Sequence, residues 1–141
     1  MYKIKLVSGE ENIIDFEERR LKAFGDIKKI NDYRESAFGQ AIKDGDFLAF
    51  NCVQDDKNVG GLLISANETD VNIERIFVDK DYRGNGIGTY LLEYVNKHHD
   101  FFEDYFGIEL EGITLEPMND NFDYYYDRGF DSFGFQMYKK F

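Results

Sequence analysis

The sequence predicts an α/β fold built on a mostly antiparallel mixed sheet of about six to seven strands with about four helices. Several short segments alternate apolar and polar residues with the period of a half-buried strand, whereas others repeat them at helical spacing. A glycine-rich turn also joins an apolar strand to an amphipathic helix. Because the chain has 141 residues and is 43% hydrophobic, we expect residues 1–141 to form a single domain.

The first half of the chain predicts one strand, two helices and then three strands. Tyr2, Ile4 and Leu6 alternate with lysines, and Ser8-Gly9 precedes acidic residues that are typical of a first helical turn. Short polar turns separate the later strands, which indicates an antiparallel meander. The predicted strands cover residues 2–8, 47–53, 59–66 and 71–78, and the predicted helices cover residues 10–23 and about 29–43, with a break at Gly25-Asp26.

The second half predicts helix, strand, helix and strand. A helix over 87–97 carries an apolar stripe, and residues 101–106 fit either its extension or a loop. Residues 107–116 alternate and end at Pro117, the only proline, which predicts a strand. A helix over 119–128 and a final strand over 130–140 complete the chain, and one long crossover joins the fourth strand to the fifth.

The composition limits the classes of partner. With 28 acidic and 17 basic residues, the net charge is −11, so we expect no nucleic-acid partner, because most of the surface would repel a phosphate backbone. A cationic partner fits better, although net negative charge alone also keeps proteins in solution. The single Cys52 excludes an intrachain disulfide, and its apolar surroundings favour a buried thiol over a nucleophile.

No feature of the sequence predicts a metal site or a membrane segment. His98 and His99 are adjacent at a predicted helix end, so they cannot share a helical face. No stretch approaches the ~18 apolar residues of a membrane span, and no leader pattern precedes the first strand. We therefore expect a cytoplasmic protein without metal and without a membrane partner.

The glycine-rich turn predicts an anion site. Gly84, Gly86 and Gly88 allow backbone dihedrals that other residues avoid, so successive N–H groups can converge at the positive end of the following helix. Arg83 adds a positive charge beside the turn. The alternative is a plain strand-to-helix connection, but three glycines in this frame favour phosphate binding.

Two motifs resemble those of the GNAT N-acetyltransferase superfamily. The segment Arg83-Gly-Asn-Gly-Ile-Gly88 is similar to its signature, which is Arg or Gln, any two residues, Gly, any residue, then Gly or Ala. Tyr125-Tyr-Asp-Arg-Gly-Phe130 resembles the aromatic-Tyr-x-x-x-Gly-Phe element near the end of the family's domain. A dinucleotide-binding turn would instead need glycine at Thr89.

The resemblance implies the GNAT, or acyl-CoA N-acyltransferase, fold and acetyl-CoA as cosubstrate. It implies that the backbone of the turn binds the pyrophosphate and that the pantetheine arm runs beside one strand. The alternative for this strand is a fully paired core element. The residues implied in the turn are Arg83, Gly84, Asn85, Gly86, Ile87, Gly88 and Thr89, and those in the strand are Ile76, Phe77 and Val78.

The resemblance also implies two catalytic side chains. Glu74 lies where the family often places a carboxylate that removes the amine proton, although it could instead form a salt bridge or be a solvated strand residue. Tyr125 lies at the position of the hydroxyl that protonates the leaving thiolate. The chain departs from the family at Met118, where asparagine is common, so Asn119 is the substitute we expect to contact the pantetheine arm, with Asn121 as an alternative.

The expected reaction is acetyl transfer from CoA to a primary amine by direct attack. Acidic residues crowd the region that shapes the acceptor pocket in this family, which favours a cationic small molecule or peptide, although such residues are usually a solvated helix face. They are Glu10, Glu11, Asp15, Glu17, Glu18, Asp26, Asp32 and Glu35. Two alternatives remain: a non-catalytic acyl-CoA-binding sensor or regulatory module, and a structural interaction domain with a vestigial turn. A homodimer is also left open.

Overall fold

The computed structural model describes residues 1–23, 33–118 and 121–141, and side chains only from residue 37 onward within the second helix. The chain divides into two compact units. The first unit comprises Met1–Ile64 and Arg75–Leu91, and the second comprises Ser65–Glu74 and Leu92–Phe141. The predicted break at Gly25-Asp26 and the predicted start of the second helix lie outside the described residues.

Within the described ranges, seven strands form one mixed sheet in the order β1-β2-β3-β4-β5-β7-β6. The strands are β1 (Tyr2–Leu6), β2 (Leu48–Gln54), β3 (Lys57–Ala66), β4 (Asp70–Val78), β5 (Gly112–Leu115), β6 (Asp131–Phe133) and β7 (Gln136–Lys140). The helices are α1 (Glu10–Ala23), α2 (Tyr33–Asp44), the short 3-10 helix η2 (Lys80–Tyr82), α3 (Ile87–Lys97), α4 (His99–Phe106) and α5 (Phe122–Tyr126). The α/β class expected from the sequence is confirmed.

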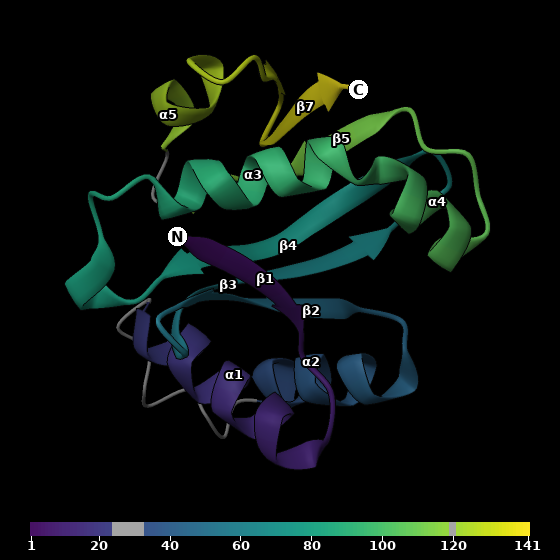
Figure 1. Cartoon of the computed structure of the whole chain (residues 1–141). Coiled ribbons are helices and arrows are strands. Elements are labelled where there is room, and N and C mark those ends of the chain that lie inside the picture. Colours follow the sequence, from purple (N-terminus) through teal and green to yellow (C-terminus); the bar gives the residue numbers. More distant parts are fainter. Residues whose placement is uncertain (24–32, 119–120) are drawn as a thin grey trace. The chain divides into compact units, whose positions relative to one another are not determined.

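In the first unit, α1 and α2 lie on the same side of β1 to β3 (Figure 1). Ile13 and Phe16 of α1 are both buried. They lie on the same face of the helix because they are three residues apart. They pack with Val7, Ile42, Ala49, Leu63 and Phe77 in one hydrophobic cluster. This cluster fixes the C-terminal part of β4, from which the glycine-rich turn starts.

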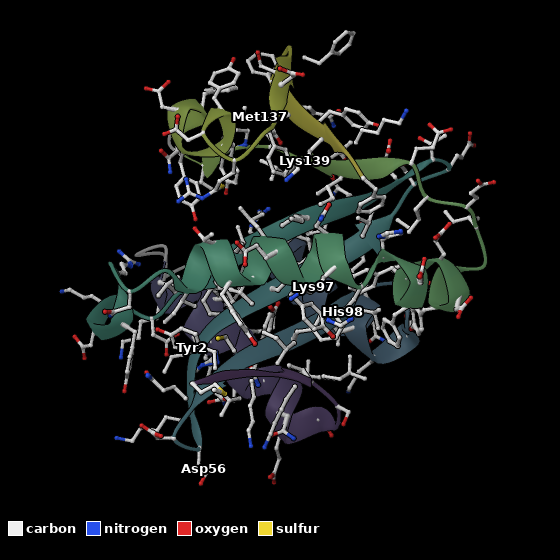
Figure 2. All side chains as sticks on the ribbon, turned by 45° about the horizontal axis from the view of Figure 1, so that its top comes forward. Tyr2, Asp56, Lys97, His98, Met137 and Lys139 are labelled. Atoms are coloured by element: carbon white, nitrogen blue, oxygen red, sulfur yellow. The ribbon has the colours of Figure 1, made fainter. Side chains whose placement is uncertain are left out.

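In the second unit, β5 pairs in parallel with the start of β4 and antiparallel with β7. The register places Asp70 opposite Gly112 and Asn72 opposite Thr114. Gly112 is required here because an added Cβ would lie 2.4 Å from the carbonyl oxygen of Lys139. Figure 2 shows Met137 and Lys139 along β7, and Met137 is buried.

The C-terminal strand prediction was wrong, because residues 130–140 form two strands rather than one. β6 and β7 pair antiparallel, and Gly134 turns the chain between them with a φ of +64°. The flanking Phe133 and Phe135 are 85% and 82% exposed. Alternation alone suggested one strand, and Gly134 was the signal of the turn.

The strand predicted over 107–116 is shorter, and the ambiguous segment before it is helical. Residues 101–106 belong to α4, which ends at Gly107, whose left-handed backbone (φ +71°) lets its N–H cap the helix through the Glu103 carbonyl. The amide of Leu110 then donates to the Glu103 carboxylate, 3.0 Å away. These bonds compete with strand pairing, so β5 begins only at Gly112.

No helix in the part of the chain that the structure describes combines the length and apolar character that a bilayer crossing needs.

Candidate functional site

The turn between β4 and α3 has the backbone shape of an anion cradle. Gly84 and Gly86 have φ values of +82° and +78°, in the left-handed region that favours glycine. An added Cβ at either position would meet nothing within 4 Å, so backbone conformation rather than space demands glycine. Both residues are exposed.

The start of α3 supplies the N–H groups of this cradle. The amide of Tyr90 donates to the carbonyl of Gly86 at 2.9 Å, the first i to i−4 bond of the helix. The amides of Ile87 and Gly88 therefore precede the first amide that donates within the helix, and the positive end of the helix dipole lies beside them. A phosphate at this helix start would be bound without any charged side chain.

Side chains hold the carbonyl groups of the turn. The Asn85 amide donates to the Tyr82 carbonyl at 3.0 Å, and the Tyr2 hydroxyl donates to the Asn85 carbonyl at 3.2 Å. The Tyr90 hydroxyl donates in turn to the Tyr2 carbonyl at 3.1 Å. These bonds tie the turn to β1 and α3.

The structure gives Arg83 two backbone partners. Its Nε donates to the carbonyl of Val78 at 3.2 Å, and one Nη donates to the carbonyl of Ala23 at 2.6 Å. Ala23 is the last residue of α1. The side chain thus links the turn to the end of α1 while its positive charge stays beside the glycines.

The end of β4 combines a buried core residue with half-buried neighbours. Phe77 is 3% exposed and packs edge-on against Phe16, with ring centroids 5.3 Å apart. Ile76 and Val78 are half-buried. An added Cβ at Gly61 would lie 2.3 Å from the Phe77 ring, so β3 has no room for a side chain at this position. The side chain of Phe77 therefore fixes the backbone of β4.

An ionic cluster follows directly after β4. Arg19 donates to the side-chain oxygen of Asn51 at 3.0 Å and to the Gly60 carbonyl at 3.2 Å. Its Nε lies 3.9 Å from the Asp79 carboxylate. Burial raises the pKa of Asp79 above its usual value, and the charge of Arg19 partly opposes this rise. The sequence analysis missed this cluster because nothing in the helix pattern marks Arg19 as inward-facing.

Cys52 is confirmed as a buried strand thiol. It is 0% exposed within β2, and burial raises its pKa from 9.0 to about 11. A thiol that remains protonated and inaccessible is a poor nucleophile. The geometry gives Cys52 a packing role.

In the second unit, Glu74 belongs to a polar network rather than to a solvated surface. Its Oε1 accepts hydrogen bonds from the Ser65 hydroxyl and from the Asn72 amide, each at 2.8 Å. The Asn72 side-chain oxygen accepts in turn from the Thr114 hydroxyl at 2.9 Å. Only Glu74 of this network was singled out from the sequence. The alternation of side chains along a strand could have suggested Asn72, which lies two residues before Glu74. Ser65 and Thr114 could be identified only from the strand register, because they lie on other strands.

Tyr125 is held firmly near the end of α5. It is 7% exposed, and its ring contacts those of Tyr124 and Phe130 edge-on, with centroids 5.0 and 5.7 Å apart. Its carbonyl accepts from the amides of Arg128 and Phe130, and Gly129 allows this reversal with a φ of +90°. Burial, assisted by Tyr124, raises the pKa of the Tyr125 phenol from 10.0 to about 12. The phenol therefore stays protonated at neutral pH.

The two units thus divide the residues predicted from the sequence. The first contains the predicted donor-binding positions of β4 and the turn, and the second contains Glu74 and Tyr125. Asn119 lies outside the described residues. Met118 is 43% exposed, and Asn121 directly precedes α5.

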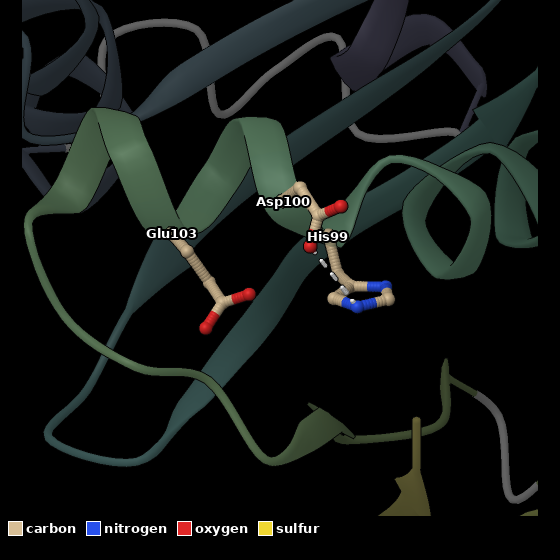
Figure 3. Close-up of side chains that lie close together, drawn as sticks. All are labelled: His99, Asp100 and Glu103. Carbon is tan, nitrogen blue, oxygen red and sulfur yellow. Dashed lines mark ion pairs between the residues drawn. The ribbon is translucent and has the colours of Figure 1, made fainter.

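Among the residues that the structure describes, one cluster of side chains of metal-ligand type lies on α4. His99, Asp100 and Glu103 place one ligand atom each within 4.8 Å of one another (Figure 3). His99 Nδ1 pairs with the Asn96 carbonyl at 2.9 Å, and its Nε2 lies 3.4 Å from the Asp100 carboxylate. Because the cluster sits at the positive end of a helix and Glu103 already accepts the Leu110 amide, interactions within the chain account for it. His99 begins α4, so the expectation that both histidines end a helix was wrong.

Comparison with known proteins identifies the family. The model of the acetyltransferase (GNAT) domain matches residues 45–132, which contain the glycine-rich turn, Glu74 and Tyr125. The chain therefore belongs to the GNAT acetyltransferase family and is an N-acetyltransferase. Among curated proteins, no match was found.

Solved structures of this family share the fold at low sequence identity. The PaiA N-acetyltransferase of Thermoplasma acidophilum in complex with coenzyme A is 18% identical, with a TM-score of 0.69 over 100% of this chain and 99% of that one. An aminoglycoside acetyltransferase from an uncultured soil metagenomic sample is 17% identical, with a TM-score of 0.71 over 94% and 93%. A GNAT family acetyltransferase of Elizabethkingia anophelis with acetyl-CoA bound is 13% identical, with a TM-score of 0.69 over 99% and 98%.

Proposed function

We propose that this protein transfers the acetyl group of acetyl-CoA to a primary amine by direct attack of the amine on the thioester. The observation that carries the proposal is the exposed turn in which two left-handed glycines precede the first amides of α3. The similar structures with coenzyme A and acetyl-CoA bound support acetyl-CoA as the donor.

Donor binding is assigned to the main chain. The pyrophosphate would accept hydrogen bonds from amides of the turn, with Gly84 and Gly86 setting their direction and Arg83 adding positive charge. Thr89 would add its hydroxyl. The pantetheine arm would lie along Ile76 to Val78. The burial of Phe77 supports this assignment, because a strand anchored by its core side chain presents a rigid backbone.

The chemical step requires a neutral amine, a stabilised oxyanion and a proton for the leaving thiolate. Glu74 would accept the amine proton as the new C–N bond forms, and a backbone N–H near Phe77 or Val78 would stabilise the oxyanion. Tyr125 would give its proton to the CoA sulfur as the C–S bond breaks. The Tyr125 phenol carries its proton at neutral pH, as this role requires. A covalent acetyl-cysteine step is disfavoured by the burial of Cys52.

The acceptor we propose is a cationic amine. Glu10 and Asp15 of α1 are 71% and 52% exposed, and the net charge of −11 would raise the local concentration of cations. The similar aminoglycoside acetyltransferase supports this class. Polyamines, aminoglycosides, lysine side chains and peptide N-termini are the candidates.

An acceptor-panel assay tests this function. Free thiol release from acetyl-CoA is followed with each candidate amine, for the wild type and for Tyr125→Phe. We expect at least one amine to be acetylated, and we expect the variant to lose about 10²-fold or more of kcat while its acetyl-CoA affinity is retained. Binding of acetyl-CoA with no turnover on any amine would instead favour the non-catalytic sensor. Absence of acetyl-CoA binding would contradict both functions.

A further inference from the structure

The carboxylate of Glu74 is held from one side by two donors on neighbouring strands. Ser65 lies on β3 and donates to Oε1, and Asn72 lies two residues before Glu74 on β4 and donates to the same oxygen. Side chains two residues apart on a strand point to the same face. Both hydrogen bonds are 2.8 Å long, within the usual range for side-chain hydrogen bonds.

The orientation of the Asn72 amide is itself fixed from a third strand. Thr114 of β5 lies opposite Asn72 in the parallel register, is 9% exposed, and donates its hydroxyl to the Asn72 side-chain oxygen. With that oxygen turned toward Thr114, the amide nitrogen must face Glu74. A flipped amide would place an oxygen against the carboxylate, which is unfavourable because neither atom can donate.

We propose that Ser65, Asn72 and Thr114 are positioning residues that fix the Glu74 carboxylate for proton transfer from the acceptor amine. This proposal rests on the proposed function, in which Glu74 is the general base. The two donors, one of them oriented by Thr114, restrict the rotation of a flexible side chain, so the base is oriented before the amine arrives.

The network predicts a defect in turnover rather than in substrate binding. None of the three side chains carries a charge, and the residues assigned to the donor lie elsewhere, on the turn and at the end of β4. Loss of one hydrogen bond to a charged carboxylate corresponds to about tenfold in rate. Donor affinity and the acceptor KM should change little.

Two matched pairs of variants test the proposal. Ser65→Ala and Thr114→Val remove a hydroxyl, whereas Ser65→Thr and Thr114→Ser retain one at nearly the same place. We expect about tenfold lower kcat in the first pair and near wild-type kcat in the second, with the acetyl-CoA Kd unchanged in all four. Equal kcat for Ser65→Ala and Ser65→Thr, and for Thr114→Val and Thr114→Ser, would overturn the proposal, because the hydroxyl groups would then not matter.

Glu74→Gln separates failure of the network from failure of the base. If Glu74 is the base, its variant loses kcat, and Ser65→Ala adds no further loss in the Glu74→Gln background, because positioning acts only through the carboxylate. If Glu74→Gln keeps wild-type kcat, Glu74 is not the base, and the proposal that the network positions it is wrong as well. If Glu74→Gln loses kcat but Ser65→Ala and Thr114→Val do not, only the network is wrong. An additive loss in the double variant would also overturn the network.

Discussion

Replacing Gly86 with alanine separates the conformational role of this glycine from its role in donor binding. Its φ of +78° lies in the left-handed region, and an added methyl group would meet nothing within 4 Å. The expected loss of stability is therefore conformational alone, about 1–2 kcal/mol for a non-glycine residue held at this φ. A domain of ordinary stability, about 5–15 kcal/mol, stays folded after such a loss.

Gly134 provides a matched control for this substitution. It has a φ of +64°, an added Cβ would again meet nothing within 4 Å, and it lies in the β6–β7 turn. Gly134→Ala should therefore lose a similar amount of stability, as measured by urea unfolding. The two variants differ only in whether the strained residue belongs to the proposed phosphate site.

Calorimetric titration with acetyl-CoA gives the decisive comparison. In Gly86→Ala, either the backbone keeps its shape with a methyl group on the open face, or it relaxes and the amides no longer converge. Both outcomes should weaken binding by about tenfold or more, which corresponds to about 1.4 kcal/mol, whereas Gly134→Ala should bind as the wild type does. Equal affinities for the two variants would refute the argument that this backbone holds the diphosphate.

Two further predictions concern stability. Gly112→Ala should destabilise the second unit by more than about 1 kcal/mol, because the new Cβ would lie 2.4 Å from a backbone oxygen. Gly39→Ala, whose Cβ would meet only Ile13 at 3.9 Å, should be neutral or stabilising by about 0.5–1 kcal/mol. Urea unfolding that ranks the stabilities of the two variants the other way would contradict this packing argument. The raised pKa of Tyr125, about 12 against 10.0, means that the folded state keeps a proton that the unfolded chain loses, so the free energy of unfolding should fall as the pH rises from 10 toward 12. Tyr125→Phe should flatten that fall, and identical slopes in the two proteins would show that Tyr125 is not the cause.

Local sequence patterns predicted much of the fold. Apolar periodicity located α1 at its observed bounds and α3 likewise, because each helix buries one continuous stripe. The C-terminal region was harder, since alternation continues through Gly134 and hides the β6–β7 turn. Residues 107–111 also alternate, but the capping bonds of α4 hold them out of the sheet.

In the candidate site too, some residues could be predicted from the sequence and others could not. The glycine turn could be identified from sequence because its chemistry depends on neighbouring residues and on backbone dihedrals. The partners of Glu74 could not, because the register that brings Thr114 opposite Asn72 joins positions 42 residues apart. The inward-facing Arg19 was missed for a similar reason, since its acceptors lie on β2 and β3.

Hydrogen exchange of individual amides, with and without saturating acetyl-CoA, tests the central claim most directly. If the main chain of residues 83–89 grips the diphosphate, the amides from Gly84 to Thr89 slow on binding while those around Gly134 keep their rates. Unchanged exchange across 83–89 in a protein that nevertheless binds the donor would contradict the account.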